Sequence, residues 1–182
     1  MKMDWIDVGS QIVGALGVLI AAVSLAISAE TRTDDLRWRQ AEAARDALAD
    51  IHRSPAASRA LELLDCHIDG HPLQLVRPNG EVLLVDLKAA CDAAMNRAPD
   101  PWLHDEVSRW LDWFLYYMDR SGFMLSKGFF SFEDLRGPFL PYAQPLLDHR
   151  PCVERIATAH NYEHALQLLE RISQSRAAAP VA

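Results

Sequence analysis

The most uniform apolar pattern in the chain runs from Val8 to Ala29, a stretch without a single Asp, Glu, Lys or Arg. The hydrocarbon core of a bilayer is about 30 Å thick, and a helix needs about 20 mostly apolar residues to cross it. A helix is favoured there because it satisfies its backbone hydrogen bonds internally. The pattern therefore predicts that residues 1–29 form a short external tail and a transmembrane anchor.

Two other interpretations of this stretch stay open. It could be a core helix, although the rest of the chain is too short to cover a helix that is apolar on every side. It could also be a cleaved signal peptide, because Ala26 and Ser28 have the spacing of a cleavage site and Lys2 gives a weak basic start. However, Asp4 and Asp7 lie where a signal peptide carries positive charge, so we expect an uncleaved anchor.

Small residues recur along the predicted anchor at steps of three and four. Helices in lipid gain nothing hydrophobic by meeting, so they associate where small side chains let their backbones approach closely. A period of about 3.5 residues favours a left-handed pair or small bundle. We therefore predict homo-oligomerisation through a transmembrane seam of Ser10, Gly14, Gly17, Ala21, Ser24 and Ser28. The alternative is that small residues, which are common in spans, line up here by chance.

Beyond the anchor, apolar positions recur with helical spacing and predict a mainly α fold. Residues 30–52 are expected to continue the transmembrane helix as a juxtamembrane helix. Residues 53–172 are expected to form a helical cytoplasmic domain, and residues 173–182 a disordered tail. Caps and apolar stripes place the helices of the domain at about 55–69, 86–95, 101–121, 151–160 and 161–172.

Glycines and prolines predict where two of these helices end. Gly122 is expected to stop the helix of residues 101–121 in a left-handed conformation. Ser131 and Asp134 resemble a capping box that starts another helix. Gly137-Pro138 should stop this helix early, and two further prolines should keep the next segment broken.

The period changes from helical to alternating around residues 73–85. Two short apolar runs flank Asn79-Gly80, the dipeptide that most strongly favours a tight turn because both positions tolerate positive φ. We predict one small β-hairpin at about 73–85, packed on helices because an isolated hairpin is only marginally stable.

The predicted helix of residues 101–121 carries an unusually aromatic stripe, with Trp113 and Tyr116 widening it. A stripe with this spacing is most often part of a hydrophobic core. It could alternatively line a ligand pocket. The residues at helical spacing are Leu103, Val107, Trp110, Leu111, Phe114, Tyr117 and Met118.

Charge and cysteine content indicate the compartment and exclude one class of partner. Only Lys2 precedes the anchor, whereas four arginines follow it within about twenty residues, so the positive-inside rule places the C-terminal domain in the cytoplasm. Three cysteines without framework spacing fit a reducing compartment. The chain has a formal net charge of −7, which argues against a nucleic-acid partner.

The sharpest chemical motif is the string from His160 to His164, which fits H-x-x-E-H. In inverted zinc peptidases of this pattern, two His one helical turn apart bind Zn²⁺ and Glu163 would be the general base. The chemistry also needs a third protein ligand, and Glu170 is the only acidic residue that follows. A metal-dependent hydrolase is therefore one of the hypotheses.

A structural metal site needs only protein ligands, whereas a catalytic site also needs an open position for water. His149 and Cys152 lie just upstream, which makes His149, Cys152, His160 and His164 a candidate set of four metal ligands. A second cluster consists of Cys66, His67 and His71. The alternative is that these are ordinary polar positions, so no cofactor is expected.

Taken along its length, the chain resembles a group of uncharacterised bacterial proteins. These are small single-pass membrane proteins with a mostly helical cytoplasmic domain of unknown function. The resemblance covers most of residues 5–172, and it implies the same architecture and a bacterial inner membrane. It supplies no catalytic residues. The stretches that carry it are residues 60–65, the Asn79-Gly80 hairpin, and residues 110–114, 128–135 and 162–166.

Three hypotheses for the function follow. The first is a membrane-anchored, non-enzymatic interaction or regulatory protein with the lipid bilayer, a second copy and a cytoplasmic protein as partners. The second is a membrane effector of a bacterial stress or anti-phage system, whose anchor disturbs the bilayer on oligomerisation. The third is the metal-dependent hydrolase that would use the H-x-x-E-H string.

Overall fold

A computed structural model describes residues 5–95 and 100–177, and within the first range the side chains of residues 5–22 and of Ala26 are not described. The chain divides into two compact units, Met1–Arg39 and Gln40–Ala182. The boundary between them falls inside the segment predicted as a juxtamembrane helix.

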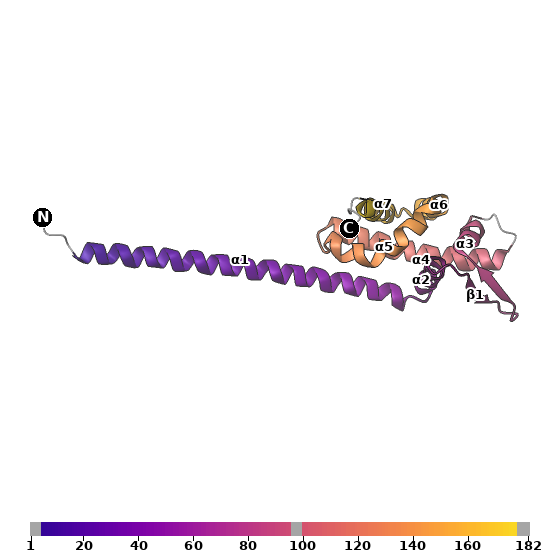
Figure 1. The fold of residues 1–182 in the computed structure, drawn as a ribbon, viewed down its shortest axis with the longest axis horizontal. Helices are drawn as coiled ribbons and strands as arrows, with labels where there is room; N and C mark the ends of the chain where they lie inside the picture. Colours follow the sequence, from indigo (N-terminus) through magenta and orange to yellow (C-terminus); the bar gives the residue numbers. More distant parts are fainter. Residues whose placement is uncertain (1–4, 96–99, 178–182) are drawn as a thin grey trace. The chain divides into compact units, whose positions relative to one another are not determined.

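The first unit belongs to helix α1 (Trp5–Arg53), which continues without a break into the second unit (Figure 1). The predicted helix over residues 30–52 is therefore confirmed. In the part of the chain that the structure describes, no helix is both long enough and apolar enough to cross a bilayer. The backbone of the predicted anchor belongs to α1, but most of its side chains, including those of Ser10, Gly14, Gly17 and Ala21, are not described, whereas Ser24 and Ser28 are exposed.

The second unit consists of helices and one two-stranded sheet, which confirms the mainly α class with a single hairpin (Figure 1). After the end of α1, the elements are α2 (Pro55–Ile68), β1 (Leu73–Val76), β2 (Val82–Val85), α3 (Leu87–Ala94), α4 (Pro101–Ser126), α5 (Phe132–Asp148), α6 (Arg150–His160) and α7 (Glu163–Ala177).

Helix α4 is the centre of the core. Helices α2, α3, α6 and α7 all pack against it, and α5 packs against α2, α6 and α7. The predicted stripe is largely buried, because Leu111, Phe114 and Met118 are almost completely inaccessible. Burying a side chain of this size stabilises the fold by about 1.5–3 kcal/mol, so α4 contributes much of the energy that holds the unit together.

Side-chain caps begin the helices where the sequence predicts them. A cap satisfies backbone N–H groups that have no partner within the helix. Ser131 and Asp134 form the predicted capping box, in which each side chain accepts a bond from the backbone of the other residue. The capping residues of α2, α3, α4 and α5 are Ser54, Asp86, Asp100 and Ser131.

The hairpin is antiparallel, with Leu73 opposite Val85 and Val76 opposite Val82. The turn lies at Asn79-Gly80 as predicted, but of these two residues only Gly80 has a positive φ, +83°, and the Gly80 N–H donates to the Arg77 carbonyl. Leu73, Leu75 and Val85 face the core, because side chains alternate between the two faces of a strand.

The prediction that Gly122 ends a helix is wrong. Gly122 lies inside α4, which continues to Ser126, and Gly128 adopts the left-handed conformation instead, with φ +77°. The reason for a glycine at position 122 is close packing. A Cβ there would lie 2.7 Å from the backbone oxygen of His164 in α7.

The prediction of a broken segment after Gly137 is also wrong. Helix α5 runs unbroken from Phe132 to Asp148 with Pro138, Pro141 and Pro145 inside it. Their spacing of three and four places them on one face, and Pro138 and Pro141 are exposed, so water can solvate the carbonyl groups that they leave unpaired. The opposite face, which includes Leu135 and Phe139, is buried and holds the helix in place.

The last helix is longer than the prediction. Helix α7 continues to Ala177, beyond its predicted end at Ile172 and into the predicted tail that begins at residue 173. Tertiary contacts explain the extra residues, because the Arg136 Nε of α5 donates to Ser175 Oγ at 3.0 Å. The predicted tail beyond residue 177 lies outside the described residues.

Candidate functional site

An open groove of about 800 Å³ lies between the end of α1, the start of α2, strand β1 and one face of α4. All of these elements belong to the second unit. Its walls combine basic, acidic and aromatic side chains, which are Asp50, Arg53, Arg59, Trp102, Glu106, Arg109, Trp110, Trp113 and Tyr117.

The junction between α1 and α2 forms one wall of the groove. Helix α1 ends at Arg53, and the Ser54 backbone N–H donates to the Asp50 carbonyl. The Ser54 hydroxyl then caps α2, and Pro55 occupies the first helical turn, where its missing N–H costs nothing. The positive end of the α2 dipole therefore lies at the groove.

The opposite wall is a single face of α4. Positions 102, 106, 109, 110, 113 and 117 are spaced by three or four residues or by multiples of a turn, which places them on one side of a helix. Trp110 is buried at the base, whereas Trp113 is 43% exposed and packs edge-on against Tyr116. Such half-exposed aromatic rings are typical of binding surfaces.

The three arginines of the groove are held only by neighbours on their own helices. Arg109 pairs with Glu106 at 2.5 Å, Arg53 with Asp50 at 3.1 Å, and Arg59 with Glu62 at 2.5 Å. Their side chains are between 51% and 72% exposed, and exposed pairs at this spacing are worth at most about 0.5 kcal/mol. An anionic ligand would therefore lose little by replacing one of these partners.

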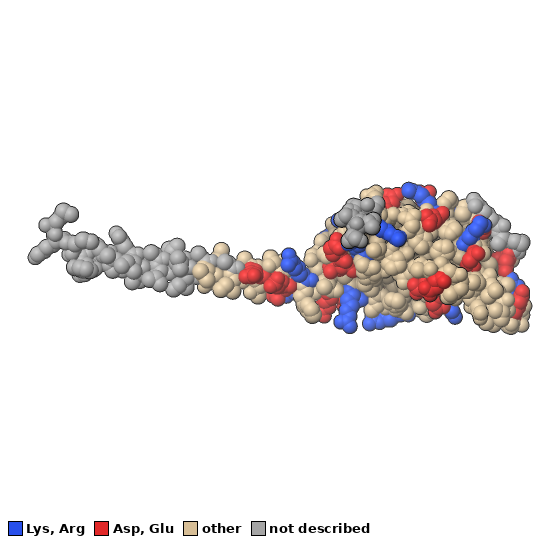
Figure 2. All heavy atoms as spheres, viewed as in Figure 1, with Lys and Arg blue, Asp and Glu red and all other residues tan. Residues whose placement is uncertain are grey.

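The groove differs in charge from the rest of the second unit. Residues 40–182 contain 14 basic and 20 acidic side chains, whereas the groove has three arginines against Asp50 and Glu106. Figure 2 shows acidic and basic side chains interspersed over the visible face of this unit. With Glu62, the partner of Arg59, included, the groove is balanced in charge on an acidic domain, and it combines exposed arginines with aromatic side chains.

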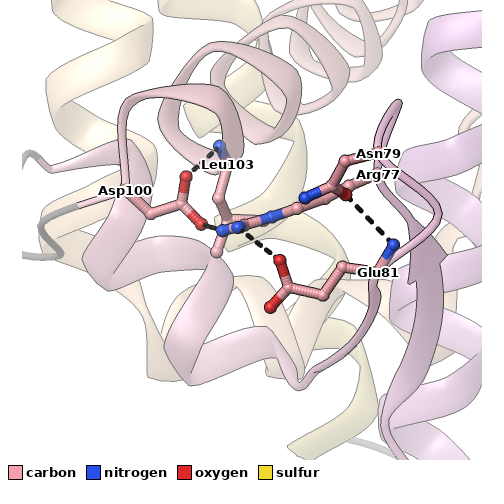
Figure 3. A network of polar contacts seen from close by, with 5 residues as sticks. All are labelled: Arg77, Asn79, Glu81, Asp100 and Leu103. Atoms are coloured by element: carbon pink, nitrogen blue, oxygen red, sulfur yellow. Dashed lines mark hydrogen bonds and ion pairs between the residues drawn. The ribbon is translucent and has the colours of Figure 1, made fainter.

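Beside the groove, Arg77 links the hairpin to the start of α4 (Figure 3). Its guanidinium contacts both Asp100, the cap of α4, and Glu81 on the far side of the turn. The same group lies 5.8 Å from the centre of the Trp102 ring. Among the described residues, Arg77 Nε is the only buried side-chain nitrogen or oxygen without a hydrogen-bond partner.

The H-x-x-E-H string is split between two helices. Helix α6 ends at His160, Asn161 adopts the left-handed conformation with φ 58°, and α7 begins at Glu163. The two histidines therefore do not occupy successive turns of one helix, which is the geometry that the zinc-peptidase pattern requires. Glu170 forms an ion pair with Arg150 at 2.8 Å.

His160 and His164 have different neighbours. The ring of His160 stacks on Tyr162, and its Nε2 lies 3.4 Å from Asp112 Oδ1. The ring of His164 lies beside Phe123, with 5.6 Å between the ring centres.

The other members of the four-ligand set, His149 and Cys152, also contact residues outside the set. The Cys152 thiol is buried and is hydrogen-bonded to the Cys91 thiol. This hydrogen bond, together with burial, raises the pKa of Cys91. Burial and the neighbouring His67 lower the pKa of His149, whose ring lies 6.3 Å from that of His67.

No group of three or more His, Cys, Asp or Glu side chains within residues 5–95 and 100–177 is arranged to hold a metal ion. The described residues therefore do not bring the predicted four-ligand set together. The cause is the short turn between α6 and α7 and the burial of Cys152 in the core. The second cluster is not gathered either: Cys66 is partly buried, and His71 lies 3.9 Å from Asp69.

The groove was not predicted from the sequence, although a pocket lining was one interpretation of the aromatic stripe. Phe114 and Met118 of the stripe are core residues, while Tyr117 and the neighbouring Trp113 line the groove; that the groove binds a ligand stays a prediction. The contribution of α1, α2 and β1 depends on tertiary packing and leaves no local motif. Comparison of the chain with protein-family models, curated proteins and solved structures found no match.

Proposed function

We propose that this chain is a membrane-anchored, non-enzymatic interaction or regulatory protein, and that the groove of the second unit recognises its partner. The observation that carries this proposal is the groove itself, which presents three exposed arginines and several aromatic side chains on an otherwise acidic domain. Arginine, tryptophan and tyrosine are the residues that most often dominate binding energy at protein interfaces.

The uncharged stretch from Val8 to Ala29 and the arginines that follow it support a location in the bacterial inner membrane with the second unit in the cytoplasm. The lipid bilayer and a second copy of the chain, held through the small residues of the seam, are then partners of the anchor.

The groove can be tested by photo-crosslinking in intact membranes. A photo-reactive phenylalanine analogue would replace Trp113 in the groove or, as a control, Phe129, which is 55% exposed and does not line the groove. We expect an adduct of defined mass from position 113 only, and its loss when Arg109→Glu is added. Equal adducts from both positions, or none from position 113, would contradict the proposal.

The anchor can be tested separately. The protein should resist extraction by alkaline carbonate, and a C-terminal reporter that works only in the cytoplasm should be active. Gly17→Ile and Ala21→Ile should weaken a membrane dimerisation reporter, whereas Leu19→Ile, off the seam, should not. Release by carbonate would refute the anchor, and equal signals from the three variants would refute the seam.

A further inference from the structure

One edge of strand β1 faces the groove. The groove lining includes three consecutive residues of the strand, Gln74, Leu75 and Val76, but no residue of β2. Successive side chains of a strand point to opposite faces, so three consecutive residues can line one groove only from the strand's edge. Because β2 pairs with the other edge of β1, the edge at the groove is the unpaired one.

The register shows which backbone groups lie on that edge. The Arg77 N–H donates to the Glu81 carbonyl, so Arg77 and Glu81 form a hydrogen-bonded pair. Hydrogen-bonded and non-hydrogen-bonded pairs alternate in an antiparallel ladder. Gln74 and Val76 are therefore in non-hydrogen-bonded pairs, with Leu84 and Val82, and their N–H and C=O groups point toward the groove.

These backbone groups have no protein partner within the described residues: the hydrogen bonds outside regular helices and strands do not involve the backbone of Gln74 or Val76. Exposed edges are usually kept short or are protected by proline, lysine or a bulge. Strand β1 is short, with four residues, but it reads Leu-Gln-Leu-Val and contains no proline, lysine or bulge. The edge is thus competent to pair with another strand.

The side chains across the groove indicate what such a strand would carry. Arg53, Arg59 and Arg109 are exposed and only weakly paired, and the α2 N-terminus adds positive potential. Trp113 and Tyr117 offer aromatic surface between them. A strand with acidic residues at alternate positions and apolar or aromatic residues between them would complement both features.

We propose that β1 accepts an extended, acidic segment of a partner protein as a third strand, which lies in the groove and is held by Arg53, Arg59 and Arg109. This inference rests on the proposed function, since it assigns the chemistry of the partner that the groove recognises. Main-chain hydrogen bonds to Gln74 and Val76 supply affinity, and the arginine and aromatic side chains supply specificity.

The test uses the full chain in detergent micelles and a library of fluorescein-labelled eight-residue peptides. The peptides carry Glu or Asp at alternate positions and Val, Leu, Phe or Trp between them. A matched library carries Lys at the acidic positions. We expect micromolar binding from the acidic library only, and at least tenfold weaker binding to Arg109→Glu.

Two proline variants isolate the strand edge. Gln74→Pro removes an N–H that points into the groove, whereas Leu84→Pro, at the paired position of β2, removes one on the far edge. For the tightest peptide we expect at least tenfold weaker binding to Gln74→Pro and less than a twofold change for Leu84→Pro. Methylation of alternate peptide amides, in the register that faces β1, should weaken binding as much as Gln74→Pro.

Several results would overturn the inference: equal binding of the acidic and Lys libraries, equal effects of the two proline variants, or indifference to amide methylation. An adduct from position 113 with the mass of two copies of the chain would assign the groove to self-association instead. If that adduct contains a partner but persists in Gln74→Pro, strand addition is wrong and the proposed function stands. If the wild-type groove forms no adduct, the proposed function itself is wrong.

Discussion

Two faces of helix α4 carry the same kinds of side chain, but the polar groups on the two faces have different partners. The face toward α7 has its polar groups tied across helices: Asp119 Oδ1 accepts from the backbone N–H groups of His164 and Ala165, at 2.8 and 3.1 Å. Asp112 accepts from the Tyr162 hydroxyl. The face toward the groove has Arg109 paired only with Glu106 of its own helix.

The difference predicts which residues are structural and which are free to bind a partner. The H-x-x-E-H string lies on the α7 side, where Asp112 and Asp119 accept hydrogen bonds from other segments, and the groove has no motif in the sequence. We therefore expect substitutions on the α7 face to change stability and substitutions on the groove face to change binding.

Gly122→Ala should have the largest effect. The new Cβ would lie 2.7 Å from a backbone oxygen of α7, so the two helices must move apart. We expect the free energy of unfolding to fall by about 1–3 kcal/mol. Gly137→Ala is the control, because Gly137 is exposed in α5 and no atom of another segment lies within 4 Å of the new Cβ. The helix preference of alanine is opposed there by crowding against the following Pro138, so we expect stability to change by less than about 1 kcal/mol. Urea unfolding followed by tryptophan fluorescence measures both, and equal effects would contradict close packing of α4 and α7.

Asp119→Ala should come next. It removes the carboxylate that caps two backbone N–H groups at the start of α7, and a cap of this kind is worth about 1–2 kcal/mol. Asp105→Ala, at an exposed position of α4, should change stability by less than about 0.5 kcal/mol. Hydrogen exchange should show faster opening of α7 in the first variant only; protection that is unchanged in both would refute the cap.

Tyr162→Phe should cost about 0.5–1.5 kcal/mol at neutral pH through the lost bond to Asp112. It should also change the response to alkali. Burial and Asp112 raise the pKa of Tyr162 to about 12, against about 10 in an unfolded chain, so the folded state keeps a proton that the unfolded state loses.

Stability should therefore fall as the pH rises from about 10 to 12, and less steeply in Tyr162→Phe, because phenylalanine does not ionise. Part of the slope will remain, since burial and Asp65 raise the pKa of Tyr142 to about 12 as well. Urea unfolding curves recorded at intervals of pH across this range measure the effect. If stability falls with pH equally steeply in the wild type and in Tyr162→Phe, Tyr162 is not held by Asp112.

Arg109→Ala should have the smallest effect on stability, because an exposed pair within one helix contributes at most about 0.5 kcal/mol. The same variant should lose the binding described for the groove. A loss of more than about 1 kcal/mol in urea unfolding would show that Arg109 is a structural residue and would remove the contrast between the two faces of α4.

The sequence by itself determined the local structure. Ser54, Asp86, Asp100 and Ser131 mark helix starts because a short side chain that accepts hydrogen bonds is useful at that position whatever lies around it. Asn79-Gly80 marks the turn because positive φ costs glycine little. Apolar spacing likewise identified the core side of α4, since burial follows the helical period.

Only the tertiary structure decided what depends on neighbours distant in sequence. Local rules end helices at Gly122 and Gly137, yet packing against α7 explains the first glycine, and the buried face of α5 outweighs the cost of its prolines. The H-x-x-E-H string does not lie on one helix, because a left-handed residue at Asn161 divides it between α6 and α7. The groove arises where the end of α1, α2, β1 and α4 meet, and no single segment predicts it, because packing brings its lining residues together from distant parts of the chain.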